Sequence, residues 1–231
     1  MTGGRKFSIG IDGPAGAGKS TIAMLLARRF GLSYVDTGAM YRGVALLAKR
    51  SGADPADEPA LSRIAENSEF RFIMDPDPEK LLNRVFLGGG DVTDAVREPE
   101  ISQLASSVSA LSGVRRALVA KQQHIGAAGG IVMEGRDICT VVLPGAEVKI
   151  FLTASPRERA RRRHAELLEK GIESDYARVL AEIRERDHRD STRADSPLKP
   201  APDSVTVDTD NITIGQVVNR IVQITLEKTG A

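Results

Sequence analysis

A glycine-rich loop near the start of the chain constrains the fold more than any other feature of the sequence. Residues 13–20 follow the pattern G-x-x-x-x-G-K-[ST] at every fixed position. The apolar run at residues 7–11 predicts a buried strand before the loop, and residues 20–30 predict a helix that ends at Gly31. A strand, this loop and a helix in that order are the setting in which such a loop binds phosphate groups. The chain is therefore expected to contain an α/β domain that binds a nucleoside triphosphate.

Each residue type in this loop has a physical role in binding a polyphosphate. Glycines let successive backbone N–H groups turn toward an anion, and the helix N-terminus adds further N–H groups and the positive end of its dipole. Lys19 is expected to reach the β- and γ-phosphates, and the Ser20 hydroxyl is a ligand for Mg²⁺. The alternative, a glycine-rich turn that carries a lysine by chance, does not explain the flanking strand and helix.

Length and composition narrow the class of protein. The chain has 231 residues, which suits one α/β domain with insertions, and its net charge of +1 provides no overall basic field for nucleic acid. Cys139 is the one cysteine, so an intrachain disulfide is excluded. Residues 1–6 show no signal-peptide core, and no apolar run of about 18 residues is present. We expect a soluble, cytoplasmic monomer that binds neither nucleic acid nor membrane.

Five expected strands alternate with expected helices along most of the chain. This order predicts a five-stranded parallel sheet with helices on both faces. Ligands of such sheets bind at the C-terminal ends of the strands, where this chain carries Asp36–Thr37 and Glu134–Asp137. The strands are expected at residues 7–11, 32–37, 130–134, 146–152 and 204–208.

One stretch departs from the alternation. Residues 69–74 and 81–87 predict two strands, and the turns at 75–78 and 88–91 indicate an antiparallel hairpin unit. We interpret this unit, which covers about residues 66–97, as an insertion into the β/α pattern.

Charged residues at the expected strand ends are candidates for phosphate and metal binding. Arg42 lies one helical turn after Gly38, from where its guanidinium could bind a phosphate with two hydrogen bonds, although it could also be an ordinary surface arginine. Glu134 ends an apolar strand, where phosphate-loop enzymes keep an acid for Mg²⁺ or its waters. Arg136 and Asp137 follow it, and a structural ion pair between them is the alternative to a role in binding.

Two expected helices in the last third of the chain are rich in arginine. Residues 156–163 carry five arginines against one glutamate, and a second arginine cluster lies between residues 184 and 193. Two such helices joined at Gly171 predict a lid that closes over a polyphosphate and excludes water. The alternative is a solvated charged helix face, while nucleic-acid binding lacks the interleaved aromatic residues that would support it.

Together these motifs resemble the bacterial cytidylate (CMP) kinase family. The resemblance runs from about residue 7 to the C-terminus and rests most specifically on the phosphate loop combined with Asp36–Arg42, Glu134–Asp137 and the hairpin insertion. It implies the nucleoside-monophosphate-kinase fold as one domain over residues 1–231, with a monophosphate-binding insertion at 66–105 and a lid at 156–194. It also implies phosphorylation of CMP and dCMP by ATP with Mg²⁺.

The resemblance assigns roles to individual positions of this sequence. The implied catalytic residues are Lys19, Arg42, Arg136 and Arg186. The implied ATP-binding residues are Gly13, Pro14, Ala15, Gly16, Ala17, Gly18, Lys19, Ser20, Thr21 and Arg157. The implied CMP-binding residues are Thr37, Tyr41, Arg42, Ser106, Arg115, Arg136, Asp137, Arg186, Asp190 and Arg193. Mg²⁺ is expected on Ser20, with Asp36 and Glu134 contributing through water.

The hydrogen-bonding groups of cytosine match the residues that the resemblance implies for reading the base. Cytosine presents an N4 amino donor, which the carboxylate of Asp137 can accept, whereas uracil presents an acceptor at the same position. A mismatch of this kind leaves a buried polar group unpaired and discriminates strongly. The family often has glycine where this chain has Cys139, which would be strained if the backbone there required a positive φ.

Two other functions remain open at this stage. A related phosphate-loop kinase could act on another nucleoside monophosphate, such as UMP, or on a small hydroxyl acceptor. A protein of a different class would use ATP as a switch and bind a partner without any acceptor. The arginines on the acceptor side favour the kinase, because they have no role in a switch.

Overall fold

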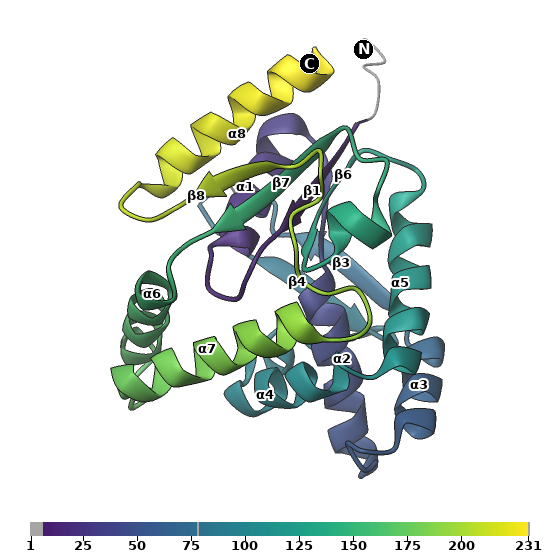
Figure 1. Ribbon diagram of the computed structural model, residues 1–231. Helices are drawn as coiled ribbons and strands as arrows, with labels where there is room; N and C mark the ends of the chain where they lie inside the picture. Colours follow the sequence, from purple (N-terminus) through teal and green to yellow (C-terminus); the bar gives the residue numbers. More distant parts are fainter. Residues whose placement is uncertain (1–6, 78, 231) are drawn as a thin grey trace.

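The computed structural model describes residues 7–77 and 79–230, and its centre is a parallel sheet (Figure 1). The five strands lie side by side in the order β2-β6-β1-β7-β8, all of them parallel, so the expected sheet is confirmed. The register places Asp36 opposite Glu134 and Asp12 opposite Gly135, which gathers these side chains at one edge. The strand bounds are β1 Ser8–Asp12, β2 Ser33–Asp36, β6 Ile131–Gly135, β7 Val148–Thr153 and β8 Val205–Asp208.

Helices α1 (Lys19–Phe30) and α8 (Ile214–Thr229) cover one face of the sheet (Figure 1). Alternate strand residues such as Ile9, Ile11 and Ile150 point to this face, where they pack against apolar residues of both helices. Thr213 is the N-cap of α8 and forms a capping box with Gln216.

The opposite face is covered by α2 (Thr37–Ser51) and α5 (Ser112–Gly126), whose apolar residues pack with Met133 of β6. A π-helical turn, η2 (Ile138–Val142), also packs on this side of β1, and the sequence did not predict it. Gly10 of β1 allows the close approach, since a Cβ atom there would lie 2.9 Å from Sγ of Cys139.

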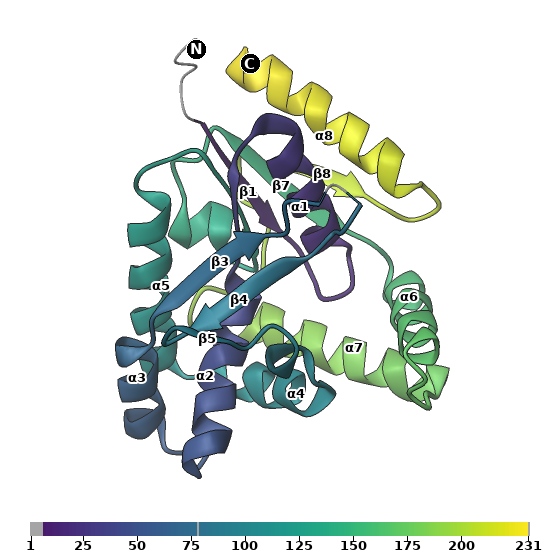
Figure 2. The same ribbon diagram turned by 180° about the vertical axis from the view of Figure 1, so that it is seen from behind.

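The expected antiparallel unit is present as a second sheet of three strands (Figure 2). It begins after α3 (Glu58–Asn67) and continues into the 3₁₀ turn η1 (Ala95–Arg97) and α4 (Pro99–Val108). Arg28 of α1 donates to the backbone carbonyls of Asp75 and Asp77 at 3.1 and 2.9 Å, which fastens the hairpin turn to the core. Pro78, the last residue of the turn expected at 75–78, lies outside the described residues, as does the segment 1–6. The strands are β3 Phe70–Met74, β4 Asn83–Leu87 and β5 Gly90–Asp91.

The two arginine-rich helices, α6 (Pro156–Glu169) and α7 (Tyr176–Thr192), pack against each other beside the sheet (Figure 1). Ser155 and Asp175 cap their N-termini by accepting from the backbone N–H groups three residues later. A small apolar cluster of Ala160, Val179 and Ile183 holds the pair together. Within residues 7–77 and 79–230, no helix has the length and apolar character required to span a membrane.

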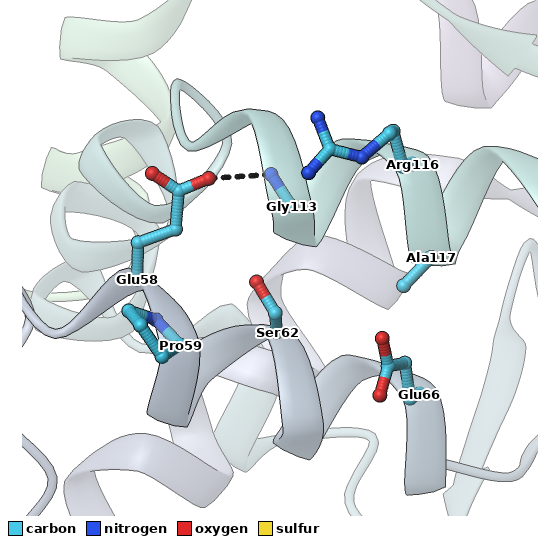
Figure 3. A pocket seen from close by; sticks show the side chains of 7 residues that line it. All are labelled: Glu58, Pro59, Ser62, Glu66, Gly113, Arg116 and Ala117. Carbon is cyan, nitrogen blue, oxygen red and sulfur yellow. Dashed lines mark hydrogen bonds between the residues drawn. The ribbon is translucent and has the colours of Figure 1, made fainter.

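A narrow groove separates α3 from α5, and Figure 3 shows how closely the two helices approach. The carboxylate of Glu58 accepts a hydrogen bond of 2.6 Å from the backbone N–H of Gly113, in the first turn of α5. A Cβ atom at Gly113 would lie 2.2 Å from Oγ and 3.2 Å from Cβ of Ser62. A side chain at position 113 would therefore require Ser62 to turn its hydroxyl away and to shift its Cβ atom.

We expect the Gly113→Ala substitution to destabilise the protein by about 1–3 kcal/mol, the usual cost of forcing an extra carbon into a packed contact. The measurement is the free energy of unfolding in urea. Gly145→Ala is the matched control, because a Cβ atom at Gly145 meets no atom of the described residues within 4 Å. Equal stability of the two variants would contradict this account of the contact.

Candidate active site

The glycine-rich loop lies between β1 and α1 and is shaped by glycines with positive φ. Gly13, Gly16 and Gly18 have φ values of 151°, 76° and 88°. A Cβ atom at Gly13 would lie 2.0 Å from the carbonyl oxygen of Leu152, so only glycine fits beside β7. Helix α1 then begins at Lys19, and its first backbone N–H groups are available for an anion.

Glu134, at the end of β6, collects polar groups from three neighbouring elements. The hydroxyl of Ser20 donates to Oε1 of Glu134, and the hydroxyl of Tyr34 donates to the same oxygen at 3.0 Å. Nζ of Lys19 lies 3.9 Å from Oε2 of Glu134 and donates to the carbonyl of Pro14 at 2.9 Å. Thr37 donates from its hydroxyl to the backbone carbonyl of Glu134 at 2.7 Å, which ties the start of α2 to this strand end.

This arrangement fits Mg²⁺, because a hydroxyl and a carboxylate oxygen meet at the mouth of the phosphate loop. Mg²⁺ in such sites takes one or two protein oxygens and completes its shell with phosphate oxygens and water. Asp36 is engaged elsewhere, since its carboxylate accepts from the N–H of Ala39 at 2.9 Å and from Arg42 at 2.7 Å. Of the two acids expected from the sequence, Glu134 is the one that meets Ser20.

Four cationic side chains, those of Lys19, Arg42, Arg136 and Arg186, gather around the phosphate loop. Burial and the neighbouring charge of Arg136 lower the pKa of Lys19 to about 7. Burial and Arg136 likewise lower the pKa of Arg186 to about 10. Among the described atoms, Nε of Arg42 and Nε of Arg186 are buried without a hydrogen-bond partner. Only Arg136 has a close partner of its own on α7, because its Nε donates to Asp190 at 2.8 Å. A cluster of buried cations of this kind can bind a polyanion.

A second group of expected residues meets behind this cluster. Asp137 accepts a hydrogen bond of 2.6 Å from Arg115, and Arg193 lies 3.8 Å from its other oxygen. The guanidinium of Arg115 also lies 5.6 Å from the ring centre of Tyr41. Burial raises the pKa of Tyr41 to about 12, and its hydroxyl has no hydrogen-bond partner among the described residues. Asp137 thus pairs with Arg115 and Arg193, and the alternative of an Arg136–Asp137 ion pair is wrong.

The loop that carries Arg136 and Asp137 is held by Asp12, a residue that sequence reasoning did not single out. Its buried carboxylate accepts from the backbone N–H groups of Ile138 and Cys139 at 2.7 and 2.8 Å. Burial raises the pKa of Asp12, and burial together with Asp12 raises that of the Cys139 thiol. Cys139 is not among the residues with positive φ, so the cysteine is accommodated without backbone strain.

The remaining expected residues lie at the edges of this site. Ser106 is in the last turns of α4, close in sequence to Ser109, whose carbonyl accepts from Arg115 at 3.2 Å. Arg157 is exposed in the first turn of α6 and lines a separate groove with Ser155, Tyr176 and Asp210. It is not brought to the cation cluster around Lys19.

The arginines of α6, which lie within the lid expected at 156–194, differ from one another in their surroundings. Arg161, Arg162 and Arg163 form ion pairs with Glu158 or Glu166 of their own helix. Arg161 and Arg163 follow the alternative of a solvated charged face, whereas Arg162 also donates to the hydroxyl and the backbone carbonyl of Thr209 at 3.0 and 2.7 Å. Arg159 points inward instead, donating to Asp187 and to the carbonyl of Ala15, and no sequence signal distinguished it from its neighbours.

The lowered pKa of Lys19 predicts that the protein takes up a proton when a polyphosphate binds. Between pH 7 and the ordinary lysine value of 10.5, the free protein holds a neutral Lys19, and a bound anion restores its charge. Uptake of a proton means that affinity for ATP falls as pH rises through this window. Calorimetry of ATP–Mg²⁺ binding at pH 8.5, in two buffers with different ionisation enthalpies, should give an uptake of about one proton. Binding heats that are independent of the buffer would contradict the prediction.

Comparison with known proteins yields a consistent set of relatives. The family model described as cytidylate kinase matches residues 9–227. A cytidylate kinase from Pelotomaculum thermopropionicum is 51% identical over 93% of this chain and 94% of that protein. Another, from Lactiplantibacillus plantarum, is 49% identical over 96% of each chain. Among solved structures, an uncharacterized protein from Eubacterium ventriosum superposes with a TM-score of 0.52 at 10% identity, over 95% of this chain and 98% of that one, which concerns the fold alone.

Proposed function

This chain belongs to the cytidylate kinase family, and from that premise we propose that the strand-end site transfers the γ-phosphate of ATP to CMP or dCMP. The observation that carries the proposal is the cluster of Lys19, Arg42, Arg136 and Arg186 beside the phosphate loop. Phosphoryl transfer between two nucleotides brings several negative charges together, and desolvated cations are what such a reaction requires.

We assign the donor to the phosphate loop. Backbone N–H groups of residues 13–20 and the side chain of Lys19 bind the β- and γ-phosphates, and Thr21 lies in the same first turn of α1. Ser20 and, through water, Glu134 hold Mg²⁺, which supplies charge neutralisation to the β- and γ-phosphate oxygens when bound. Arg157 is assigned to the ATP side because it lines the groove at the start of α6, outside the acceptor site.

We assign the acceptor to the residues on the opposite side of Lys19. Arg42, Arg136 and Arg186 hold the phosphate of CMP, and Asp190 with Arg193 binds on the ribose side. Asp137, Arg115 and Ser106 read the base, and Thr37 and Tyr41 line the pocket. The buried Arg115–Asp137 pair supports this assignment, because it holds in one position a carboxylate that can accept from the N4 amino group of cytosine.

The reaction proposed at this site is a direct in-line transfer. An oxygen of the CMP phosphate attacks the γ-phosphorus, the bond from that phosphorus to the β–γ bridging oxygen breaks, and ADP leaves. No general base is needed, because the attacking phosphate oxygen is already anionic. Lys19 and the arginines stabilise the charge that spreads over the transferred group, and closure of the site excludes water.

The test is ADP formation from ATP–Mg²⁺ with CMP, dCMP, UMP, AMP, GMP and dTMP supplied one at a time. Strong stimulation by CMP and dCMP alone is the expected result. Stimulation by another acceptor would overturn the assignment of the base pocket and leave that of the phosphate loop intact. Slow ATP hydrolysis without stimulation by any acceptor would favour the ATP-gated binding protein.

Several expectations from the sequence stay predictions. They are the division into an insertion at 66–105 and a lid at 156–194, the monomeric state and the cytoplasmic location. The relative use of CMP and dCMP is decided by the same acceptor assay.

A further inference from the structure

Arg159 differs from the other arginines of α6 in its burial and in its partners. The residue is 2% exposed, whereas Arg157 and Arg161 of the same helix are exposed to solvent. Its Nε donates to the carbonyl of Ala154 at 2.9 Å, and one terminal nitrogen donates to the carbonyl of Ala15 at 3.1 Å. A buried guanidinium with several partners in fixed directions is costly to move and well suited to hold its partners in place.

The contact with Ala15 bears directly on the phosphate loop. The peptide bond between Ala15 and Gly16 is trans, so the N–H of Gly16 points away from the carbonyl that Arg159 binds. Holding that carbonyl therefore fixes the direction of one N–H group in the loop. The stem of Arg159 also rests on this peptide, since a Cβ atom at Gly16 would lie 3.2 Å from Cβ of Arg159.

The other contact of Arg159 reaches the helix that carries acceptor-side residues. Two of its nitrogens donate to the two carboxylate oxygens of Asp187 at 2.9 and 2.6 Å, in a two-pronged pair. Asp187 is the neighbour of Arg186 and lies one helical turn before Asp190 in α7. One buried side chain thus connects the donor loop to the helix that supplies Arg186 and Asp190.

We propose that Arg159 is a positioning residue that couples the two nucleotide sites: each nucleotide favours the arrangement in which Arg159 binds both Ala15 and Asp187, and this arrangement also favours binding of the other nucleotide. The inference rests on the proposed function, because it takes ATP and CMP as the two ligands. The coupling is reciprocal, so each nucleotide tightens the binding of the other by the same factor.

The experiment measures the dissociation constant of CMP by calorimetry, with and without a non-hydrolysable ATP analogue and Mg²⁺. In the unaltered protein the analogue should tighten CMP binding by about 5-fold or more, the lower end of typical allosteric coupling. Arg159→Lys keeps the charge but loses the two-pronged geometry, and should bring the factor to within about 2-fold of unity. Arg163→Lys, whose partner Glu166 lies on the same exposed helix face, is the matched control and should keep the full factor.

Asp187→Asn provides a second variant, because it weakens the link to α7 while leaving the contact between Arg159 and Ala15 intact. It should also lose the coupling, and it decides the question if Arg159→Lys does not fold. A coupling factor that is unchanged in both variants, or absent in the unaltered protein, would overturn the inference. Failure of the proposed function is distinguishable, since the unaltered protein would then neither bind nor phosphorylate CMP.

Discussion

Replacing Lys19 with methionine should lower kcat by about 10²–10³-fold, the usual cost of removing one group that stabilises transition-state charge. The same substitution should leave the midpoint of thermal unfolding unchanged or raise it. The physical reason is that burial and Arg136 lower the pKa of Lys19 to about 7, so the folded protein holds its positive charge at a cost. We expect Lys19 to be required for the reaction although its buried charge destabilises the folded protein.

Initial rates with saturating ATP and CMP, together with a thermal melt at pH 6.5, check this prediction. The melt is measured at low pH because the cost of the buried charge depends on pH. Below the pKa of about 7 in the folded protein, Lys19 is charged in both states and the full cost is present; above the ordinary value of 10.5 it is neutral in both states and the cost disappears. Lys49→Met is the control, since Lys49 lies in the last turn of α2 and pairs with Glu100. A Lys19→Met variant that melts well below the unaltered protein would show that Lys19 is structural, and retained kcat would remove it from the reaction.

The parallel sheet could be predicted from the sequence because its signals are local. Each strand is a short apolar run, and several are followed by a helical pattern with recognisable ends, such as Gly31 after α1 and the Thr213 capping box of α8. Bounds differ by one or two residues where side chains give no signal, as at β7, which begins at Val148 and was expected at residue 146.

The residues that gather at the site could be predicted from the sequence, whereas their hydrogen-bond and ion-pair partners could not, and this difference has a physical basis. Residues at strand ends, such as Glu134 and Arg136, are brought together by the sheet itself, so the β/α order was enough to group them. The partners of each charge were not predictable, because pairs such as Arg159–Asp187 and Asp12 with Ile138 join distant parts of the chain. The η2 turn was missed for the same reason: it depends on the buried carboxylate of Asp12.

Replacing Asp137 with asparagine should reduce the preference for CMP over UMP by about 10–100-fold, in line with the 1–3 kcal/mol that one base-reading contact contributes. Asparagine can turn an N–H donor toward the O4 acceptor of uracil, which the carboxylate cannot do. The substitution also removes the charge that faces Arg115 at 2.6 Å and Arg193 at 3.8 Å, so the protein should lose stability as well.

Loss of stability alone would lower kcat/KM for CMP and UMP by the same factor, and so the ratio of the two values is the decisive measurement. The ratio should fall in Asp137→Asn and stay unchanged in Asp57→Asn, a matched control in which asparagine keeps the cap of α3. If Asp137→Asn lowers both values equally, Asp137 supports Arg115 and does not read the base. In that case the discrimination between CMP and UMP would come from Arg115. Its guanidinium is the other charged group of the buried pair, and it offers only hydrogen-bond donors.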